Sequence, residues 1–172
     1  MERLWTPWRM AFIEQEADGA AASPDCFLCV KPAEGPARDR ENLILFRGQR
    51  AYALLNLYPY NSGHVMVAPY VHQGDLTALA EADATELFAL VRATVAVVRD
   101  TYRPEGFNVG MNLGQVAGAG VPGHLHVHVV PRWGGDTNFM PVLGDTKVMP
   151  ESLAQTYDRL RPRFDALRAM SS

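Results

Sequence analysis

Three of the five histidines stand at alternate positions, His124, His126 and His128, in the run His-Leu-His-Val-His-Val-Val. Alternate residues of a strand share one face, so this spacing predicts three imidazoles in a row at ~7 Å intervals, with the intervening apolar residues toward the core. A neutral imidazole carries a lone pair that can attack phosphorus, and its ordinary pKa of ~6.5 leaves it largely neutral at physiological pH. The run therefore favours a histidine nucleophile that splits one displacement into two steps.

A glycine-rich segment lies directly upstream of the histidines, at residues 114–120. Glycines let backbone N–H groups approach an anion closely, so this segment next to the histidines favours phosphate chemistry. A plain flexible loop is the other interpretation of the segment. The histidines have two other interpretations as well: solvated side chains on an edge strand, and a three-histidine metal centre that activates water.

The only two cysteines, Cys26 and Cys29, are spaced as Cys-x-x-Cys. Lone structural disulfides are rare in the cytoplasm, where we expect this protein, so the pair favours metal or redox chemistry. A structural zinc site usually has four ligands, which means that two must come from elsewhere in the chain. A redox pair and two plain buried thiols remain the alternatives.

Size and composition place the chain among single-domain globular proteins, with 172 residues, 48% hydrophobic and 20% charged. The formal net charge of −3 argues against a general nucleic-acid coat, which usually carries a basic excess. No apolar run approaches the ~20 residues of a membrane span, and residues 1–9 lack the apolar core of a secretory signal. We therefore expect a cytoplasmic protein with no membrane or nucleic-acid partner.

The elements that position these residues follow from periodicity and turn residues. One long helix is expected from a capping box at Asp83 and Glu86 to Tyr102, and a C-terminal helix from Pro150, which Pro162 must kink or stop. Strand-length runs of apolar residues occur at 42–46, 51–57, 64–69, 107–113 and 125–130. The connections are mostly of hairpin length, which predicts an α+β domain with a largely antiparallel sheet.

The His-x-His-x-His run, with Ser62-Gly63-His64-Val65-Met66-Val67 upstream, resembles the histidine triad (HIT) superfamily of nucleotide hydrolases and transferases. The stretches 55–61, 107–112 and 131–139 resemble its bacterial diadenosine tetraphosphate phosphorylase branch. The resemblance implies the HIT-like fold: a five-stranded sheet, one long helix and a short C-terminal helix. It implies a single HIT domain over 1–172, with an N-terminal arm (1–25), a Cys-x-x-Cys knuckle (26–40), a catalytic core (41–140) and a C-terminal segment (141–172).

The resemblance also implies a role for each matching position. His126 is expected to be the nucleophile, His128 to bind the phosphoryl oxygens, His64 to support the triad as a fourth histidine, and Asn56 to hold the ribose hydroxyls. The other positions expected to contact the nucleotide are, on the phosphate side, Asn112, Gly118, Ala119 and Gly120, and, beside the base, Leu54 and Met66. Ordinary core packing explains Leu54 and Met66 equally well.

Zinc-carrying members of the superfamily combine a Cys-x-x-Cys with histidines at the positions of His72 and His124. The resemblance therefore implies a structural Zn²⁺ held by Cys26, Cys29, His72 and His124. Such a site would pin the knuckle to the strand that bears the nucleophile.

The implied activity is cleavage of dinucleoside polyphosphates through a covalent AMP-histidine, with phosphate or water as acceptor. A homodimer is expected from the family and from Trp5, Trp8 and Trp133, which are costly to expose. The chain departs from many relatives at Val121, where they carry a Ser or Thr that can contact the leaving group. The alternatives are a nucleoside phosphoramidate hydrolase, a non-catalytic nucleotide-binding module and a metal-dependent hydrolase.

Overall fold

The computed structural model describes residues 26–137 and 149–170. The expected N-terminal arm, with Trp5 and Trp8, lies outside these residues, as does the start of the C-terminal segment up to residue 148. The elements, in chain order, are α2 (Phe27–Ala33), η1 (Pro36–Arg38), β1 (Ile44–Arg47), β2 (Ala51–Leu55), β3 (Val65–Pro69), η2 (Leu76–Ala78), α3 (Glu81–Tyr102), β4 (Gly106–Gly110), η3 (Gln115–Ala117), β5 (Val127–Arg132) and α5 (Leu153–Met170).

One five-stranded sheet organises the fold, with the order β1-β2-β3-β5-β4 and antiparallel pairing throughout. The α+β class and the antiparallel sheet are therefore confirmed, and each observed strand overlaps a predicted run. Because β5 lies between β3 and β4, the interpretation of the histidines as residues of an edge strand is wrong. The strand also begins at Val127, two residues later than predicted.

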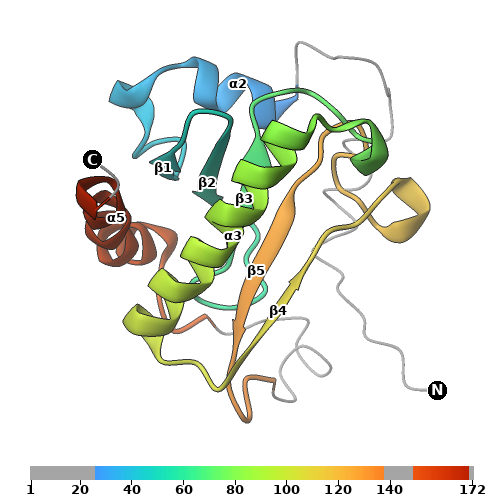
Figure 1. The fold of residues 1–172 in the computed structure, drawn as a ribbon. Helices are drawn as coiled ribbons and strands as arrows, with labels where there is room; N and C mark the ends of the chain where they lie inside the picture. Colours follow the sequence, from blue (N-terminus) through green and yellow to red (C-terminus); the bar gives the residue numbers. More distant parts are fainter. Residues whose placement is uncertain (1–25, 138–148, 171–172) are drawn as a thin grey trace, which may run out of the picture.

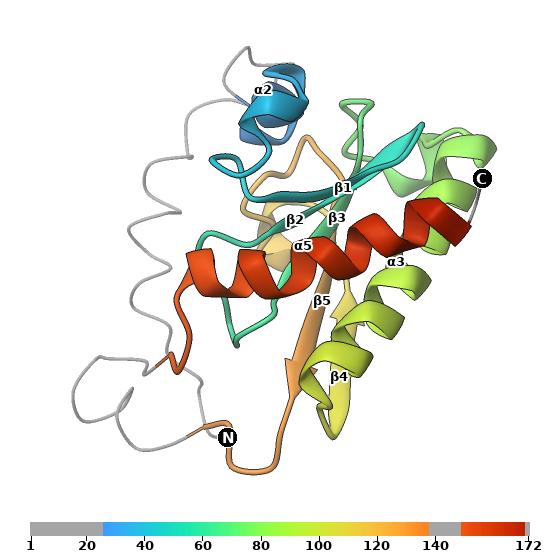
Figure 2. The ribbon, with the colours of Figure 1, turned by 90° about the vertical axis from the view of Figure 1, so that its left-hand side faces the viewer.

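The two faces of the sheet are both covered, which explains why every residue of β2 and β3 is buried. On one face, alternate residues such as Ala53 and Val67 pack with α3 and α5, which lie side by side against the sheet (Figures 1 and 2). Leu125, Val127 and Val129 join this core, as predicted. On the other face, residues of the opposite parity pack against the start of α2. The histidines and cysteines lie on this second side.

The long helix α3 ends at Tyr102, as predicted, and buries its expected apolar stripe from Leu87 to Val98. The predicted capping box is wrong, since the helix begins at Glu81 and no side chain caps its N-terminus. The Asp83 carboxylate instead accepts a hydrogen bond from the Arg50 side chain at 3.0 Å. Glu86 accepts from the backbone N–H groups of Arg50 and Ala51, so it fastens the β1–β2 turn to the helix.

The C-terminal helix α5 spans 18 residues, so the prediction of a short helix is wrong. It continues through Pro162, which does not stop it. An internal proline costs a helix ~3 kcal/mol. Leu160 and Phe164, on either side of the proline, are fully buried in the main core, and this packing offsets that cost.

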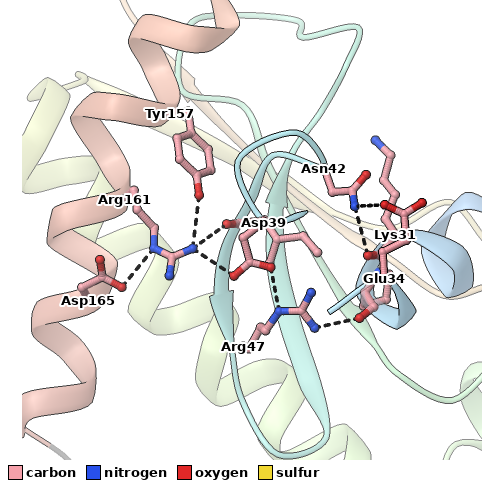
Figure 3. A network of polar contacts seen from close by, with 10 residues as sticks. Lys31, Glu34, Asp39, Asn42, Arg47, Tyr157, Arg161 and Asp165 are labelled. Atoms are coloured by element: carbon pink, nitrogen blue, oxygen red, sulfur yellow. Dashed lines mark hydrogen bonds and ion pairs between the residues drawn. The ribbon is translucent and has the colours of Figure 1, made fainter. Parts of the chain in front are cut away.

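The segment expected to be a knuckle between loops is helical, with Cys26 at the N-cap of α2 and Cys29 inside it. The buried carboxylate of Asp39 fastens this region to the rest of the fold (Figure 3). It accepts from Arg47 on β1 at 2.8 Å and from Arg161 on α5 at 3.1 Å. Arg47 also donates to the carbonyl of Pro32 in α2, so one carboxylate links α2, β1 and α5. Among the described residues, no helix is both long and apolar enough to cross a membrane.

Candidate functional site

A row of paired residues crosses the sheet on the face opposite α3. His128 of β5 pairs with Met66 of β3 and Gly110 of β4, and Met66 pairs with Leu54 of β2. Directly paired residues share a face, so the side chains of Leu54 and Met66 lie on the same side of the sheet as His128. Both are buried, in the apolar cluster that contains Cys26.

The hydrogen bonds of His64 and His128 assign the tautomer of each ring. The backbone N–H of Tyr60 donates to His64 Nδ1 at 3.1 Å, so the proton of the neutral His64 ring is on Nε2. This Nε2–H group lies 3.0 Å from His128 Nδ1, to which it donates. The proton of the neutral His128 ring is consequently on Nε2, where it can donate to a ligand oxygen.

His126 has the opposite tautomer. Its Nδ1 lies 2.8 Å from the backbone carbonyl oxygen of His124, which can only accept. The Nδ1 atom therefore carries the proton, and Nε2 carries the lone pair. His126 is 6% exposed, and the centroid of its ring lies 5.0 Å from that of His128, with the two ring planes at 77°. Two neighbouring imidazoles thus offer a nucleophilic lone pair and a hydrogen-bond donor.

The third member of the run, His124, does not lie in a row with the other two, so the prediction of three imidazoles in one row is wrong. The strand begins only after it, and its side chain turns to the two cysteines. Its Nδ1 lies 3.4 Å from both Cys26 Sγ and Cys29 Sγ. His72 Nδ1 lies 3.3 Å from Cys29 Sγ, so two histidines and two cysteines meet at one point.

These four side chains form a group that could hold a metal ion, with all four ligand atoms within 4.8 Å of one another. Tetrahedral Zn²⁺, with bonds of about 2.3 Å to sulfur and 2.0 Å to nitrogen, separates S from N by about 3.5 Å. The observed separations of 3.3 and 3.4 Å fit that geometry. His124 Nε2–H donates to the carbonyl of Pro69 at 2.9 Å, which leaves the lone pair of Nδ1 toward the sulfurs.

Burial tunes the same group. It raises the pKa of the Cys29 thiol to about 11, with a further contribution from the neighbouring Cys26. Burial also lowers the pKa of His124 to about 4, so this imidazole is neutral across the physiological range. The Cys29 thiol, with its raised pKa, and the neutral imidazole of His124 belong to a donor set that a divalent cation would complete, because the cation favours the thiolate form.

Two glycines allow the His72 loop to approach the segment before β5. A Cβ on Gly74 would lie 2.5 Å from the carbonyl oxygen of Pro122, which is too close for any side chain. A Cβ on Gly123 would lie 3.1 Å from the imidazole of His72. The backbone N–H of Leu125 donates to the carbonyl of Gln73 at 2.7 Å and holds the two segments together.

The described residues contain no metal-binding group of this kind around His126 and His128. Each of these two rings already uses Nδ1 in a hydrogen bond within the chain. The interpretation of the run as a three-histidine metal centre therefore has no support in the structure.

The remaining expected residues are held in place by hydrogen bonds to backbone groups. Asn56 directly follows β2. Its side-chain oxygen accepts from the backbone N–H of Tyr58 at 2.9 Å, and its backbone N–H donates to the carbonyl of His64. Asn112 donates to the carbonyl of Gly118 at 2.9 Å, which holds the glycine-rich segment against the end of β4. Gly118 has φ +82°, a conformation that favours glycine, and Ala119 beside it is buried.

Three residues near the histidines were not expected to act there: Tyr60, Asn61 and Asp136. Tyr60 contributes a backbone N–H, for which the sequence carries no signal. Asn61 and Asp136 are joined by a 2.7 Å hydrogen bond across 75 positions. Both lie in stretches that resemble the phosphorylase branch, and this was the one signal that could have identified them.

The sequence matches the HIT domain family over residues 38–135. This chain belongs to the HIT family. It is similar to the AP-4-A phosphorylase of Mycobacterium tuberculosis, with 42% identity over 161 residues, which cover 91% of this chain and 80% of that protein. The HIT region is also similar to the asymmetrical bis(5'-nucleosyl)-tetraphosphatase of Schizosaccharomyces pombe, with 35% identity over 52% of this chain and 48% of that protein.

Solved structures show the same HIT fold. A Zn-bound histidine triad family protein from Mycobacterium smegmatis superposes with a TM-score of 0.64 at 23% identity, covering 84% of this chain and 95% of that one. The Caenorhabditis elegans NitFhit protein superposes with a TM-score of 0.57 at 26% identity, covering 70% of this chain and 27% of that one. The expected HIT-like fold is thereby confirmed.

Proposed function

We propose that this HIT protein cleaves dinucleoside polyphosphates of the diadenosine tetraphosphate type through a covalent AMP adduct on His126. The observation that carries the proposal is the pair of opposite tautomers, with the Nε2 lone pair of His126 beside the Nε2–H of His128. A site that only bound nucleotide would need donors for phosphate oxygens but no adjacent nucleophile, so the pair disfavours a non-catalytic module.

In the first step, His126 Nε2 attacks the α-phosphorus. An N–P bond forms while the P–O bond to the leaving nucleoside polyphosphate breaks. The positive charge that develops on the ring is stabilised by the carbonyl of His124, which accepts from Nδ1–H at 2.8 Å. His128 donates from Nε2 to a non-bridging phosphoryl oxygen, and His64 holds His128 in the tautomer that allows this.

In the second step, an oxygen of phosphate or water attacks the same phosphorus and the N–P bond breaks. Phosphate as acceptor gives ADP, and water gives AMP with loss of its proton to solvent. The relative from Mycobacterium tuberculosis is named an AP-4-A phosphorylase, and this name supports phosphate as the acceptor.

We assign the nucleotide contacts to the residues around this pair. Asn56 holds the ribose hydroxyls, and Leu54 and Met66, on the face of His128, lie beside the base. The phosphate side is lined by Asn112 and the glycine-rich segment, Gly118, Ala119 and Gly120, which Asn112 holds in place.

Product analysis with diadenosine tetraphosphate tests the proposal. With phosphate present, we expect ADP and ATP in equal amounts, and without phosphate we expect turnover to slow markedly. AMP and ATP at every phosphate level would make the protein a hydrolase while keeping the adduct. No turnover of any dinucleoside polyphosphate, with binding intact, would contradict the proposal and favour the binding module.

Phosphoramidate hydrolysis is the second candidate activity. Many relatives carry a hydroxyl that contacts the leaving group at the position of Val121. In this chain, Val121 packs against the apolar cluster of α2. Turnover of adenosine phosphoramidate faster than diadenosine tetraphosphate would favour this alternative.

We propose that the four-residue group of Cys26, Cys29, His72 and His124 holds a structural Zn²⁺. The fit of the donor distances supports this assignment, as does the Zn-bound relative from Mycobacterium smegmatis, which shares the fold. A bound Zn²⁺ would supply positive charge and rigidity at this point. Through His124, it would fix the position of the segment from 121 to 126. Cysteines that hold a metal also fit the cytoplasmic location that we propose.

We also propose that the whole chain forms one HIT domain and that it assembles as a homodimer. Strand β4 is an edge of the sheet, and exposed apolar side chains lie on and after it: Val109, Leu113 and Val116. An exposed apolar edge strand is a ready template for pairing with a second copy. Trp133 does not contribute to this argument, because it packs edge-on against Tyr102 within the chain. Solution scattering that gives a monomer mass at micromolar concentration would contradict the dimer.

A further inference from the structure

The turn between β2 and β3 determines the state of His64. The backbone N–H of Tyr60 donates to His64 Nδ1, and the carbonyl of Asn61 accepts from the backbone N–H of His64, each at 3.1 Å. The ring of Tyr60 lies over that of His64, with centroids 4.8 Å apart. A displacement of this turn would therefore move the donor that assigns the His64 tautomer.

The side chain of Asn61 fastens the turn to the far end of β5. Its amide nitrogen donates to the carbonyl of Pro131 at 3.1 Å and to Asp136 Oδ2 at 2.7 Å. Asn61 is 8% exposed, so water cannot readily replace these acceptors. Both amide hydrogens are used, and the orientation of the amide group is therefore defined.

Asp136 is in turn held by Arg132 of β5. The Arg132 guanidinium donates to its two carboxylate oxygens at 2.6 and 2.8 Å, and the backbone N–H of Trp133 donates at 3.2 Å. These hydrogen bonds, above all that from Arg132, hold the pKa of Asp136 well below its ordinary range. Arg132 also donates to Asn108 of β4 at 2.7 Å, so the contact extends across two strands.

We propose that Asn61, Asp136 and Arg132 act as positioning residues for the catalytic histidines. They fix the turn so that Tyr60 keeps His64 protonated on Nε2, which in turn keeps His128 protonated on Nε2. This inference rests on the proposed function for its effect on rate, but the tautomers themselves can be observed without any substrate.

The reason for a catalytic effect is electrostatic. If the turn relaxes, His64 exchanges between tautomers, and His128 then presents a lone pair to the phosphoryl oxygen for part of the time. A lone pair repels that oxygen, whereas an N–H donor stabilises the charge that develops on it. Asn56, to which we assign the ribose, keeps its own hydrogen bonds to Tyr58 and His64, so we expect the loss to appear in kcat more than in KM.

The experiment compares Asp136→Asn and Asn61→Asp with the control Asp158→Asn. The control also removes one partner of an arginine–aspartate pair, but on exposed side chains, Arg40 and Asp158, away from the turn. Nitrogen-15 NMR of the histidine rings, at a pH where they are neutral, reports the tautomers. Thermal unfolding of each variant, and the kinetics of its folded protein with diadenosine tetraphosphate, are measured in parallel.

We expect Nε2–H signals for His64 and His128 in the wild-type protein and in the control. In both test variants we expect mixed tautomers and a kcat lower by about 10-fold, with KM changed less than about twofold. Unchanged tautomers in the folded variants would overturn the proposal, whatever the rate. Absence of turnover in the wild type would instead count against the proposed function, and the NMR result would still decide whether Asn61 and Asp136 fix the tautomers.

Discussion

His124 and His126 are two positions apart, and yet their rings carry the proton on different nitrogens and contact different groups. His124 donates from Nε2 to the carbonyl of Pro69 and directs the Nδ1 lone pair to two sulfurs. His126 donates from Nδ1 to the carbonyl of His124 and keeps its lone pair on Nε2, next to His128. In the functions that we propose, the first ring holds a metal and the second attacks phosphorus.

This comparison shows that the position of a backbone acceptor determines which ring nitrogen of a histidine carries the lone pair. The side chains are identical, and both are nearly fully buried. What differs is which ring nitrogen meets a carbonyl, since that nitrogen must carry the proton and the other then carries the lone pair. The predictions below separate the two rings by changing one at a time.

Replacement of His126 by alanine should have the largest effect. Turnover should fall by at least about 1,000-fold, because the proposed nucleophile is removed. Affinity for a non-hydrolysable dinucleotide analogue, measured by calorimetry, should remain within a few-fold, and the metal content should not change. Comparable loss of affinity or of metal would mean that the two histidines are not separate in function.

Replacement of Cys29 by serine should have the reverse pattern. Loss of a tightly bound metal can cost about 4 kcal/mol of stability, as expected when a ligand present at 1,000 times its dissociation constant is lost. The kcat of the protein that remains folded should stay within a few-fold of the wild type. Elemental analysis should find one zinc per chain in the wild type and much less in the variant.

A matched control for this prediction is Val30→Ser, on the same helix but with a side chain that is 39% exposed. It should keep the metal and the stability of the wild type. Wild-type protein without metal, after purification free of chelators, would contradict the zinc assignment.

Replacement of Asp39 by alanine tests whether stability alone affects the histidine pair. The carboxylate is buried between Arg47 and Arg161, and removal of one partner from such a network costs about 3 kcal/mol. Chemical denaturation should show this loss, while kcat below the unfolding transition should not change. A large fall in kcat would show that the Asp39 network also positions the histidines.

Acid should reveal a smaller contribution from Asp136. Its pKa is lower in the folded protein than in the unfolded chain, chiefly because Arg132 donates hydrogen bonds to it. Its stabilising contribution is therefore complete above its ordinary pKa near 4 and is lost as the pH falls below that value. Denaturation measured from pH 5 to pH 3 should show a steeper loss of stability for the wild type than for Asp136→Asn. Equal slopes would contradict this role of Arg132.

Periodicity in the sequence was sufficient to predict the five strands, the long helix and its end at Tyr102. It was insufficient where a distant partner competed with a local pattern. Glu86 could cap its own helix, but the β1–β2 turn offered two backbone N–H donors instead. Pro162 could end a helix, but buried neighbours on both sides kept the helix continuous.

In the candidate site, too, some features could be predicted from the sequence and others could not. The resemblance supplied the metal-binding group, and the structure brings its four members together. The tautomers could not be predicted, because they depend on the carbonyls of Pro69 and His124 and on the N–H of Tyr60, and backbone groups leave no trace in residue types.

The stereochemistry of the reaction at phosphorus tests the central claim most directly. The substrate is a diadenosine tetraphosphate that carries a phosphorothioate of known configuration at both outer phosphorus atoms. With phosphate as acceptor, the configuration of the thio-ADP product is determined; with water as acceptor, oxygen-isotope-labelled water makes the thio-AMP product chiral at phosphorus. Each in-line displacement inverts phosphorus, so attack by His126 followed by attack of phosphate or water predicts overall retention. Inversion would contradict a covalent nucleotidyl-histidine and would show that the acceptor attacks the substrate directly.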